Sequence, residues 1–221
     1  KMSLKFWWDP ISQPSRSVKY ALIKSTVDYE ENEILVIKDT RSEDYKNNVN
    51  PFGKVPTIHD DDLKLYESAT QLRYILDNFC EDESLLPRSD LKARAKVDFW
   101  LDWNNTMGRP SFCTLLLKLI FLPKVFKAPL PSEEETKDLY EKVYIALTFM
   151  NQSLEDQDYL AGGELSIGDV QVYNELYEAI IMCQLDLDKY TNVAAWVERV
   201  GKDQNIKNLD EQFLARLKNS E

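Results

Sequence analysis

Residues 50–56 read Asn-Pro-Phe-Gly-Lys-Val-Pro and lead into Thr57-Ile58, a run of strand formers that contains a proline. A proline within a strand indicates an edge or an unusual turn. A cis Val55–Pro56 bond would turn the N–H and C=O of Val55 outward, where they could pair with an extended peptide. The alternative is a trans proline at the start of a strand, which is the common form. The stretch therefore predicts either a peptide-binding edge or a plain strand start.

Residues 66–68, Tyr-Glu-Ser, lie between a predicted strand and a predicted helix. A hydroxyl at such a junction can cap the helix, and the first N–H groups of a helix can hold a carboxylate. Ser68 is therefore a candidate for capping or for binding a ligand carboxylate. Glu67 is a candidate for the same capping role or for binding a ligand ammonium group.

A third junction, Ile11-Ser12-Gln13-Pro14-Ser15-Arg16, follows the strand formers at 3–8. The first helical turn tolerates proline, so Pro14 marks a helix start. A helix N-terminus favours an anion, and a hydroxyl there can donate to a thiolate or an oxyanion. Ser12 is either that hydroxyl or a simple helix cap.

The order of elements predicts two domains. Residues 1–80 follow the order β-α-β-α-β-β-α, which is typical of a small α/β domain. Residues 81–88 indicate a linker, and residues 89–221 carry only helical patterns. The expected strands cover 3–8, 29–37, 54–58 and 63–66, and the expected helices follow Pro14, Tyr66 and Ser132 and cover 40–48, 91–121, 169–183, 193–200 and 206–218. Pro110 should interrupt or kink the long helix.

Composition excludes several classes of protein. The chain has 221 residues, of which 43% are hydrophobic, so it is neither disordered nor collagen-like. Its net charge of −11 disfavours binding to nucleic acid or to a membrane surface. The excess of acids lies mainly in residues 81–221, with 25 acids and 16 bases against 13 and 11 in residues 1–80. The first domain is therefore the better place for an anionic ligand.

Three cysteines, Cys80, Cys113 and Cys183, are too few and too dispersed for a disulfide framework or a metal-ligand motif. We expect a soluble cytoplasmic protein, because neither a signal peptide nor an apolar run of 18 residues is found. The single histidine, His59, disfavours a zinc site and a histidine base, so no metal is expected.

The order and spacing of the three junctions together resemble the thioredoxin-like domain of the cytosolic glutathione transferases. The linker and the helical second half resemble that family as well, over essentially the whole chain. Leu165-Ser166-Ile167-Gly168-Asp169-Val170 is similar to the family's capping box and hydrophobic staple. Trp7 and Trp8 stand where tyrosine-type members carry a tyrosine, and the cysteine-type position is Ser12. The chain therefore resembles a serine-type enzyme, and Ser-Gln-Pro-Ser-Arg at 12–16 is similar to the theta class.

This resemblance implies an enzyme that conjugates the thiolate of glutathione to small hydrophobic electrophiles, with Ser12 as the catalytic hydroxyl and Ser15 as its rival. Glutathione is a co-substrate, and no cofactor is implied. The implied glutathione-binding residues are Arg41, Lys54, Val55, Pro56, Glu67 and Ser68. The implied electrophile-binding residues are Ile11, Trp103, Met107 and Arg109, with core packing as the alternative for Trp103 and a solvated position for Arg109.

The resemblance also implies a homodimer, in which the helix after Glu67 of one subunit packs on the long helix near 91–105 of the other. Other functions of the same fold stay open: a non-catalytic ligand carrier, a structural or translation-factor subunit, or a glutathione-dependent peroxidase. Full retention of Ser12, Val55-Pro56 and Glu67-Ser68 favours the transferase.

Overall fold

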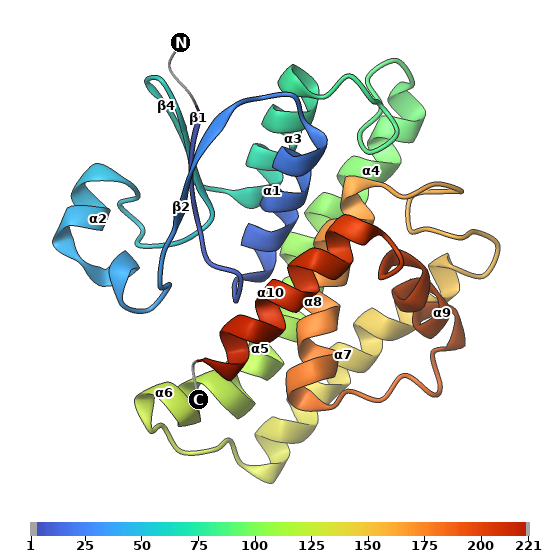
Figure 1. Cartoon of the computed structure of the whole chain (residues 1–221). Coiled ribbons are helices and arrows are strands. Elements are labelled where there is room, and N and C mark those ends of the chain that lie inside the picture. The colour runs from blue at the N-terminus through green and yellow to red at the C-terminus, as the bar shows by residue number, and fades with distance from the viewer. Residues whose placement is uncertain (1–3, 220–221) are drawn as a thin grey trace. The chain divides into compact units, whose positions relative to one another are not determined.

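The computed structural model describes residues 4–219, so Ser3 of the first expected strand and the outer ends of both expected domains lie outside it. The chain forms two compact units (Figure 1). Unit 1 contains the described residues up to Arg88 together with those from Lys202 onward, and unit 2 contains residues Ser89–Gly201.

Unit 1 is built on a four-stranded mixed sheet with the order β2-β1-β3-β4. Its strands are β1 (Leu4–Trp8), β2 (Tyr29–Glu33), β3 (Thr57–Asp60) and β4 (Leu63–Leu65). β1 and β2 are parallel and are joined by α1 (Gln13–Lys24), whereas β3 is antiparallel to β1 and to β4. The expected α/β thioredoxin-like domain is thereby confirmed.

Alternation along β1 buries one face of the sheet. Leu4, Phe6 and Trp8 are buried, while Lys5 is exposed and Trp7 is half-buried, as the period-2 geometry of a strand requires. α1 and α3 (Ser68–Phe79) pack against each other and lie on the same side of the sheet (Figure 1). Because α1 begins at Gln13, a few residues after β1 ends at Trp8, the N-terminus of α1 lies beside the end of β1.

Three strands are shorter than their sequence patterns predict, and β4 differs least, since it ends at Leu65 instead of residue 66. β2 stops at Glu33 instead of residue 37, since the Val36 N–H donates to the Asp9 carboxylate at 2.9 Å rather than to a strand. β3 begins at Thr57 instead of residue 54, because Pro56 has no N–H to donate to a ladder. The polar segment 40–48 forms a 3-10 turn, η1 (Asp39–Arg41), and a short helix, α2 (Glu43–Asn48).

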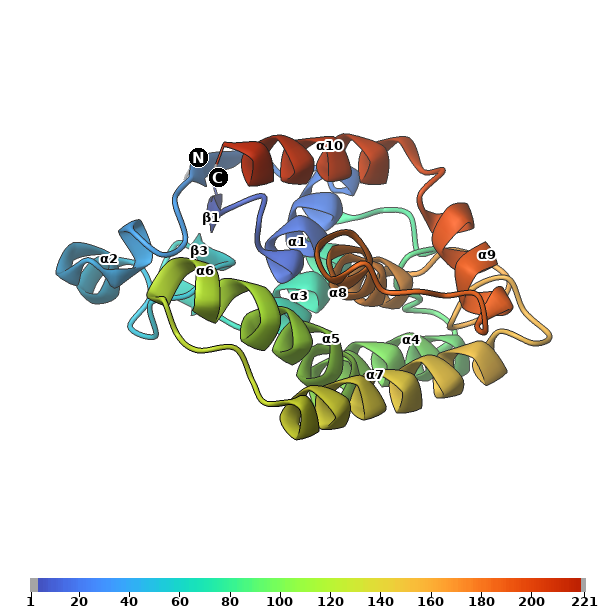
Figure 2. The same ribbon diagram turned by 90° about the horizontal axis from the view of Figure 1, so that it is seen from below.

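The C-terminal helix α10 (Gln204–Lys218) belongs to unit 1, whereas the sequence placed it in a helical domain of residues 89–221. α10 packs along α1 (Figure 2). The guanidinium of Arg16 lies 4.5 Å from the centre of the Phe213 ring, and the Tyr20 hydroxyl donates to Asp203 at 3.2 Å. These contacts join residues that are almost 200 positions apart, which no local pattern indicates.

Unit 2 is all helical, as expected. Its helices are α4 (Leu91–Trp103), α5 (Arg109–Leu116), α6 (Leu122–Phe126), α7 (Glu133–Ser153), α8 (Ile167–Cys183) and α9 (Thr191–Val200). The π-helical segments η2 (Asn104–Gly108) and η3 (Leu117–Phe121) connect α4, α5 and α6 into one long helix, which continues past the expected end at Phe121 to Phe126. Pro110 follows η2, and the wider π turn accommodates the missing N–H of the proline.

A capping box starts both long helices of unit 2. Ser132 and Glu135 exchange side-chain and backbone hydrogen bonds at the start of α7, and Ser166 and Asp169 do so at the start of α8. The second box is buried, and Asp169 also accepts from the Leu160 N–H at 2.7 Å and from the Trp196 Nε1 at 2.9 Å. Asp169 therefore fastens α8 to the preceding loop and to α9.

No helix within residues 4–219 combines the length and the apolar character that crossing a membrane requires.

Replacing Asp169 by alanine should destabilise the protein strongly. The substitution leaves the buried donors of Leu160, Ser166 and Trp196 without partners, which costs about 3 kcal/mol and roughly 6–12 °C in melting temperature. Glu135→Ala is the matched control, because it removes the same position of the exposed capping box and should cost about 1 kcal/mol. Equal losses of melting temperature in the two variants would contradict the role assigned to burial.

Candidate functional site

The three junctions singled out by the sequence meet at one edge of the sheet. Trp7 pairs with Thr57 across β1 and β3, and Ile58 pairs with Leu65 across β3 and β4. The chain leaving β1 therefore runs beside the chain entering β3, which in turn lies beside the chain leaving β4. This register brings the segments 9–12, 54–56 and 66–68 to the same end of unit 1.

Residues 9–12 form a tight turn that presents Ser12. The Ser12 N–H donates to the Asp9 carbonyl at 2.9 Å, and the Ile11 N–H donates to the Asp9 carboxylate at 3.1 Å. Aspartate at the first position of a turn and proline at the second favour this geometry. The sequence Asp9-Pro10 thus fixes the direction in which the chain enters α1.

The Ser12 hydroxyl makes no capping hydrogen bond, although Ser12 occupies the N-cap position of α1. Its backbone carbonyl accepts from the Arg16 N–H at 3.1 Å, so the helix starts without the side chain. Ser12 is half-buried. Ser15 is fully buried, and its hydroxyl has no hydrogen-bond partner in the structure. Of the two serines, Ser12 has the accessible hydroxyl at the positive end of the helix.

Residues 50–53 form a second turn of the same kind. The Gly53 N–H donates to the Asn50 carbonyl, and the Phe52 N–H donates to the Asn50 side chain, both at 2.9 Å. Gly53 has a φ of 60°, and a Cβ there would lie 2.7 Å from the Thr40 carbonyl oxygen. Only glycine fits this position, so the turn depends on it.

A buried polar network holds the carbonyl of Lys54. Tyr45, Asn50 and Thr57 each donate to that oxygen, at 2.9, 2.9 and 3.1 Å. Burial raises the pKa of Tyr45 to about 12, which is even further above neutral pH than usual, so its hydroxyl stays protonated and can donate this hydrogen bond. The network fixes the chain immediately before Val55.

The Val55–Pro56 peptide bond is cis. Among residues 4–219, neither the N–H nor the C=O of Val55 has a hydrogen-bond partner. The buried Gln71 side chain donates to the Pro56 carbonyl at 3.0 Å and to the Leu65 carbonyl at 2.8 Å. Gln71 thereby ties the proline segment to the end of β4.

Lys54 and Glu67 line one pocket of about 210 Å³, together with Asn50, Phe52 and Tyr66. The rings of Phe52 and Tyr66 meet edge to face at 5.8 Å between centroids. Ser68 is the first residue of α3, and Glu67, at the N-cap, makes no capping bond. The pocket offers charges of both signs beside a helix N-terminus, which suits a zwitterionic ligand. Arg41 is exposed in η1 and does not line this pocket.

The residues expected at the electrophile site belong to different units. Ile11 is half-buried in the Asp9–Ser12 turn of unit 1. In unit 2, Trp103 is buried and its ring stacks on Phe149 at 5.9 Å, as the core-packing alternative requires, while Met107 is exposed.

Arg109 forms an ion pair with the buried carboxylate of Glu175, which raises the pKa of the arginine. The Arg109 side chain is therefore held in one direction rather than solvated freely.

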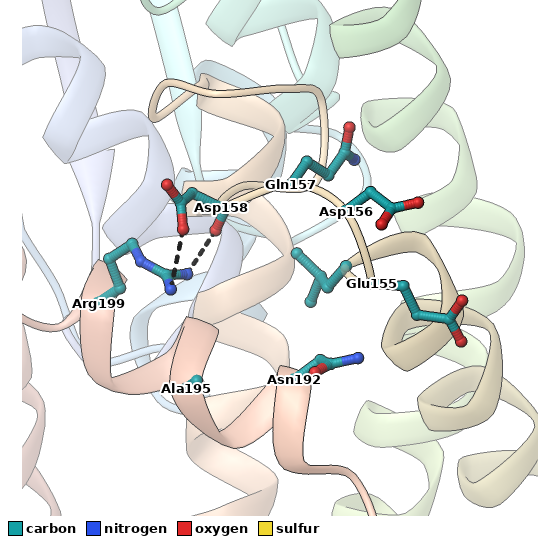
Figure 3. A pocket seen from close by; sticks show the side chains of 8 residues that line it. Glu155, Asp156, Gln157, Asp158, Asn192, Ala195 and Arg199 are labelled. Atoms are coloured by element: carbon teal, nitrogen blue, oxygen red, sulfur yellow. Dashed lines mark hydrogen bonds and ion pairs between the residues drawn. The ribbon is translucent and has the colours of Figure 1, made fainter.

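Unit 2 has a hollow of its own, of about 420 Å³, between the loop after α7 and helix α9 (Figure 3). Arg199 pairs with Asp158 at 3.1 Å, and Glu155 and Asp156 point away from that pair. Since its guanidinium is already paired and the carboxylates diverge, the hollow does not gather charges around a ligand.

The sequence patterns did not predict that the side chains of four residues hold the backbone of this site: Tyr45, Asn50, Thr57 and Gln71. Asn50 precedes a proline, which is a turn signal in its own right. Tyr45 and Gln71 donate from their side chains to carbonyls that lie 6 to 15 residues away, and Thr57 donates to one that lies 3 residues away. Such bonds leave no periodic pattern.

Comparisons with known proteins agree on one family. The model of the glutathione S-transferase N-terminal domain matches residues 9–83, and that of the C-terminal domain matches residues 112–202. Glutathione S-transferase theta-3 of the mouse is 28% identical over 199 residues, which are 90% of this chain and 82% of that protein. A probable glutathione S-transferase of rice is 32% identical over 148 residues, covering 66% of this chain and 67% of that one.

A solved structure of human glutathione transferase theta-2, in complex with glutathione and an unknown ligand, matches with a TM-score of 0.87 and 25% identity. The match covers 98% of this chain and 89% of that chain. The chain belongs to the glutathione S-transferase family and is a theta-like glutathione transferase.

Proposed function

We propose that this enzyme transfers the thiolate of glutathione to small hydrophobic electrophiles and that the Ser12 hydroxyl stabilises the thiolate. The observation that carries the proposal is the uncommitted hydroxyl of Ser12 at the N-terminus of α1. It lies at the same sheet edge as the unpaired backbone of Val55 and the pocket of Lys54 and Glu67. The solved theta-2 structure that contains glutathione supports the choice of thiol.

Stabilising the thiolate is the energetic core of the proposal. A free thiol of this type has a pKa of about 8.5, so little thiolate exists at neutral pH. Lowering that pKa by about two units requires roughly 2.7 kcal/mol of preferential stabilisation. One charge-assisted hydrogen bond from Ser12 and the positive end of α1 together supply an energy of about that size.

The tripeptide would be held by groups that are separate from the sulfur. The N–H and C=O of Val55 would pair with the cysteinyl backbone, in the manner of strand addition beside Pro56. Glu67 would bind the γ-glutamyl ammonium, and Ser68 with the first N–H groups of α3 would bind its carboxylate. Lys54 and Arg41 would face the glycyl carboxylate.

The reaction needs no base on the protein. The thiol proton leaves to solvent when glutathione binds, and the sulfur lone pair then attacks the electrophilic carbon. The carbon–sulfur bond forms while the bond to a halide or similar group breaks, and that group departs with the bonding electrons. Ile11, Met107 and Arg109 are the proposed contacts for the electrophile, whereas the buried Trp103 would support them from the core of unit 2.

Ser12→Ala should lower turnover near pH 7 by about 10- to 100-fold, corresponding to a loss of roughly 1.4–2.7 kcal/mol of transition-state stabilisation. The loss should shrink above about pH 8.5, where glutathione ionises without help. The KM for glutathione should change less, because Val55, Glu67 and Ser68 bind other parts of the tripeptide. Turnover of a halonitrobenzene from pH 6 to 9 measures all three effects.

Ser15→Ala is the matched control, since it removes a hydroxyl that is buried away from solvent. It should leave the pH profile unchanged. Wild-type turnover of Ser12→Ala at pH 6.5 would overturn the catalytic assignment. Binding to a glutathione column without turnover of any electrophile, in the wild-type protein, would favour a ligand carrier, and turnover of an organic hydroperoxide alone would favour a peroxidase.

Glu67→Gln should raise the KM for glutathione roughly fivefold, because an exposed ion pair contributes about 1 kcal/mol. The value of kcat should stay within about twofold, since Glu67 is assigned to the ammonium group and not to the sulfur. Glu43→Gln, on the exposed face of α2, is the control and should change neither constant. A fall in kcat at unchanged KM would argue against the proposed placement of the γ-glutamyl end.

We also propose a homodimer in the cytoplasm, in which the helix after Glu67 of one subunit packs on the long helix near 91–105 of the other. Unit 2 exposes apolar side chains along α4 and α7, among them Phe99, Tyr144, Ile145 and Phe149. A shallow hollow of about 560 Å³ runs over α7 beside Ile145. Such a patch on a protein surface usually marks an interface. The buried free thiols of Cys80 and Cys113 suit a reducing compartment.

Ile145→Glu should therefore weaken the dimer by at least about tenfold, because it places a charge in an apolar contact. Leu130→Glu is the control, at an exposed leucine outside α4 and α7. Sedimentation at micromolar concentration should give about twice 25.8 kDa for the wild type and for Leu130→Glu. A wild-type species of monomer mass would exclude the dimer.

A further inference from the structure

We infer that Arg216 of the C-terminal helix is a positioning residue for Ser12, acting through the buried carboxylate of Asp9. The inference rests on the proposed role of Ser12 and adds a determinant that lies more than 200 residues away in the sequence. All the groups involved belong to unit 1.

The Asp9 side chain controls the shape of the turn that ends at Ser12. One carboxylate oxygen accepts from the Ile11 N–H at 3.1 Å, and the other accepts from the Val36 N–H at 2.9 Å. The Asp9 side chain is only 3% exposed. A buried carboxylate is stable only when a positive charge and hydrogen bonds replace its hydration. Asp9 therefore needs a cation to keep the turn in this form.

Arg216 supplies that cation. Its Nε lies 3.2 Å from the same Asp9 oxygen that holds the Ile11 N–H, and its guanidinium also pairs with Glu33 at the end of β2. The Arg216 side chain is about one-fifth exposed, whereas that of Glu33 is about half exposed. The pair with Asp9 is thus the better shielded of the two and the stronger for that reason.

A second contact from α10 acts on the same turn. The Arg16 guanidinium lies against the Phe213 ring and donates to the Pro10 carbonyl at 2.8 Å. Phe213 and Arg216 are three positions apart on α10, so they project from the same side of the helix. One face of α10 therefore fixes Pro10 through Arg16 and Ile11 through Asp9. These two residues immediately precede Ser12.

The consequence for catalysis is geometric. A hydrogen bond to a thiolate weakens steeply when the donor is misaligned, and within residues 4–219 the Ser12 hydroxyl makes no capping hydrogen bond that would hold it otherwise. Its direction depends on the backbone of the turn. Loosening that turn should raise the pKa of bound glutathione without touching the groups that hold the tripeptide.

Arg216→Gln tests this inference in the full-length enzyme. We expect turnover at pH 6.5 and saturating glutathione to fall about tenfold, with the KM for glutathione within about twofold, which is the pattern of a lost transition-state interaction. The deficit should disappear above about pH 8.5, where the thiol ionises unaided. Arg216→Lys keeps the charge and should recover most of the lost rate.

Two controls separate positioning from general damage. Glu33→Gln removes the other partner of Arg216 and should keep wild-type kinetics. Arg199→Gln breaks an arginine–aspartate pair in unit 2 and should do the same. Phe213→Leu leaves the Asp9–Arg216 pair intact and should reproduce the pH-dependent deficit in smaller measure, even if Arg216→Gln folds poorly. A deficit that is equal at all pH values, or none in either α10 variant, would overturn the inference.

The double variant Ser12→Ala, Arg216→Gln distinguishes this inference from the proposed function. If Arg216 acts through Ser12, the double variant should be no slower than Ser12→Ala alone, because the two losses are not additive. Additive losses would refute the positioning role while leaving Ser12 as the thiolate donor. Full activity of Ser12→Ala would refute the proposed function itself.

Discussion

One buried carboxylate, that of Asp9, connects three parts of unit 1. It holds the turn before α1 through the Ile11 N–H, it holds the chain after β2 through the Val36 N–H, and it pairs with Arg216 of α10. Such a group is costly to bury, so it is stable only while all of its partners stay in place. The position of Ser12 and the docking of the C-terminal helix therefore depend on each other.

The turn at Asn50 has the same hydrogen-bond geometry as the turn at Asp9, but its first side chain is uncharged. Both turns start with a short polar side chain followed by proline, and both use that side chain to accept an N–H two residues later. The Asn50 amide also has donors, and these reach the Lys54 carbonyl and the Thr57 hydroxyl. The Asn50 amide is therefore stable without a counter-ion, whereas the buried Asp9 carboxylate needs a cation. The neutral turn leads into the Val55–Pro56 segment, the proposed peptide-binding edge, and the charged turn is tied to α10.

The sequence predicted what local chemistry dictates. The strand–helix junctions at Ser12 and Ser68, the helix start after Ser132 and the all-helical second half follow from turn residues, caps and periodicity, whereas the capping box at Ser166 was expected from the family resemblance. The place of α10 in unit 1 could not be predicted, because the contacts of Phe213 and Arg216 reach across almost the whole chain. The same limit applies to Gln71, whose side chain bonds to the carbonyls of Pro56 and Leu65.

The single histidine of the chain, His59, has a structural role and not a catalytic one. His59 donates through Nε2 to the Val49 carbonyl at 2.8 Å, and burial lowers its pKa, so it is a structural donor and not a base. The proposed mechanism instead relies on backbone groups, a helix N-terminus and one hydroxyl, none of which changes its charge near neutral pH. Thiolate formation would then be governed by alignment rather than by a titrating side chain. Rigid turns around Asp9 and Asn50 are what such a mechanism requires.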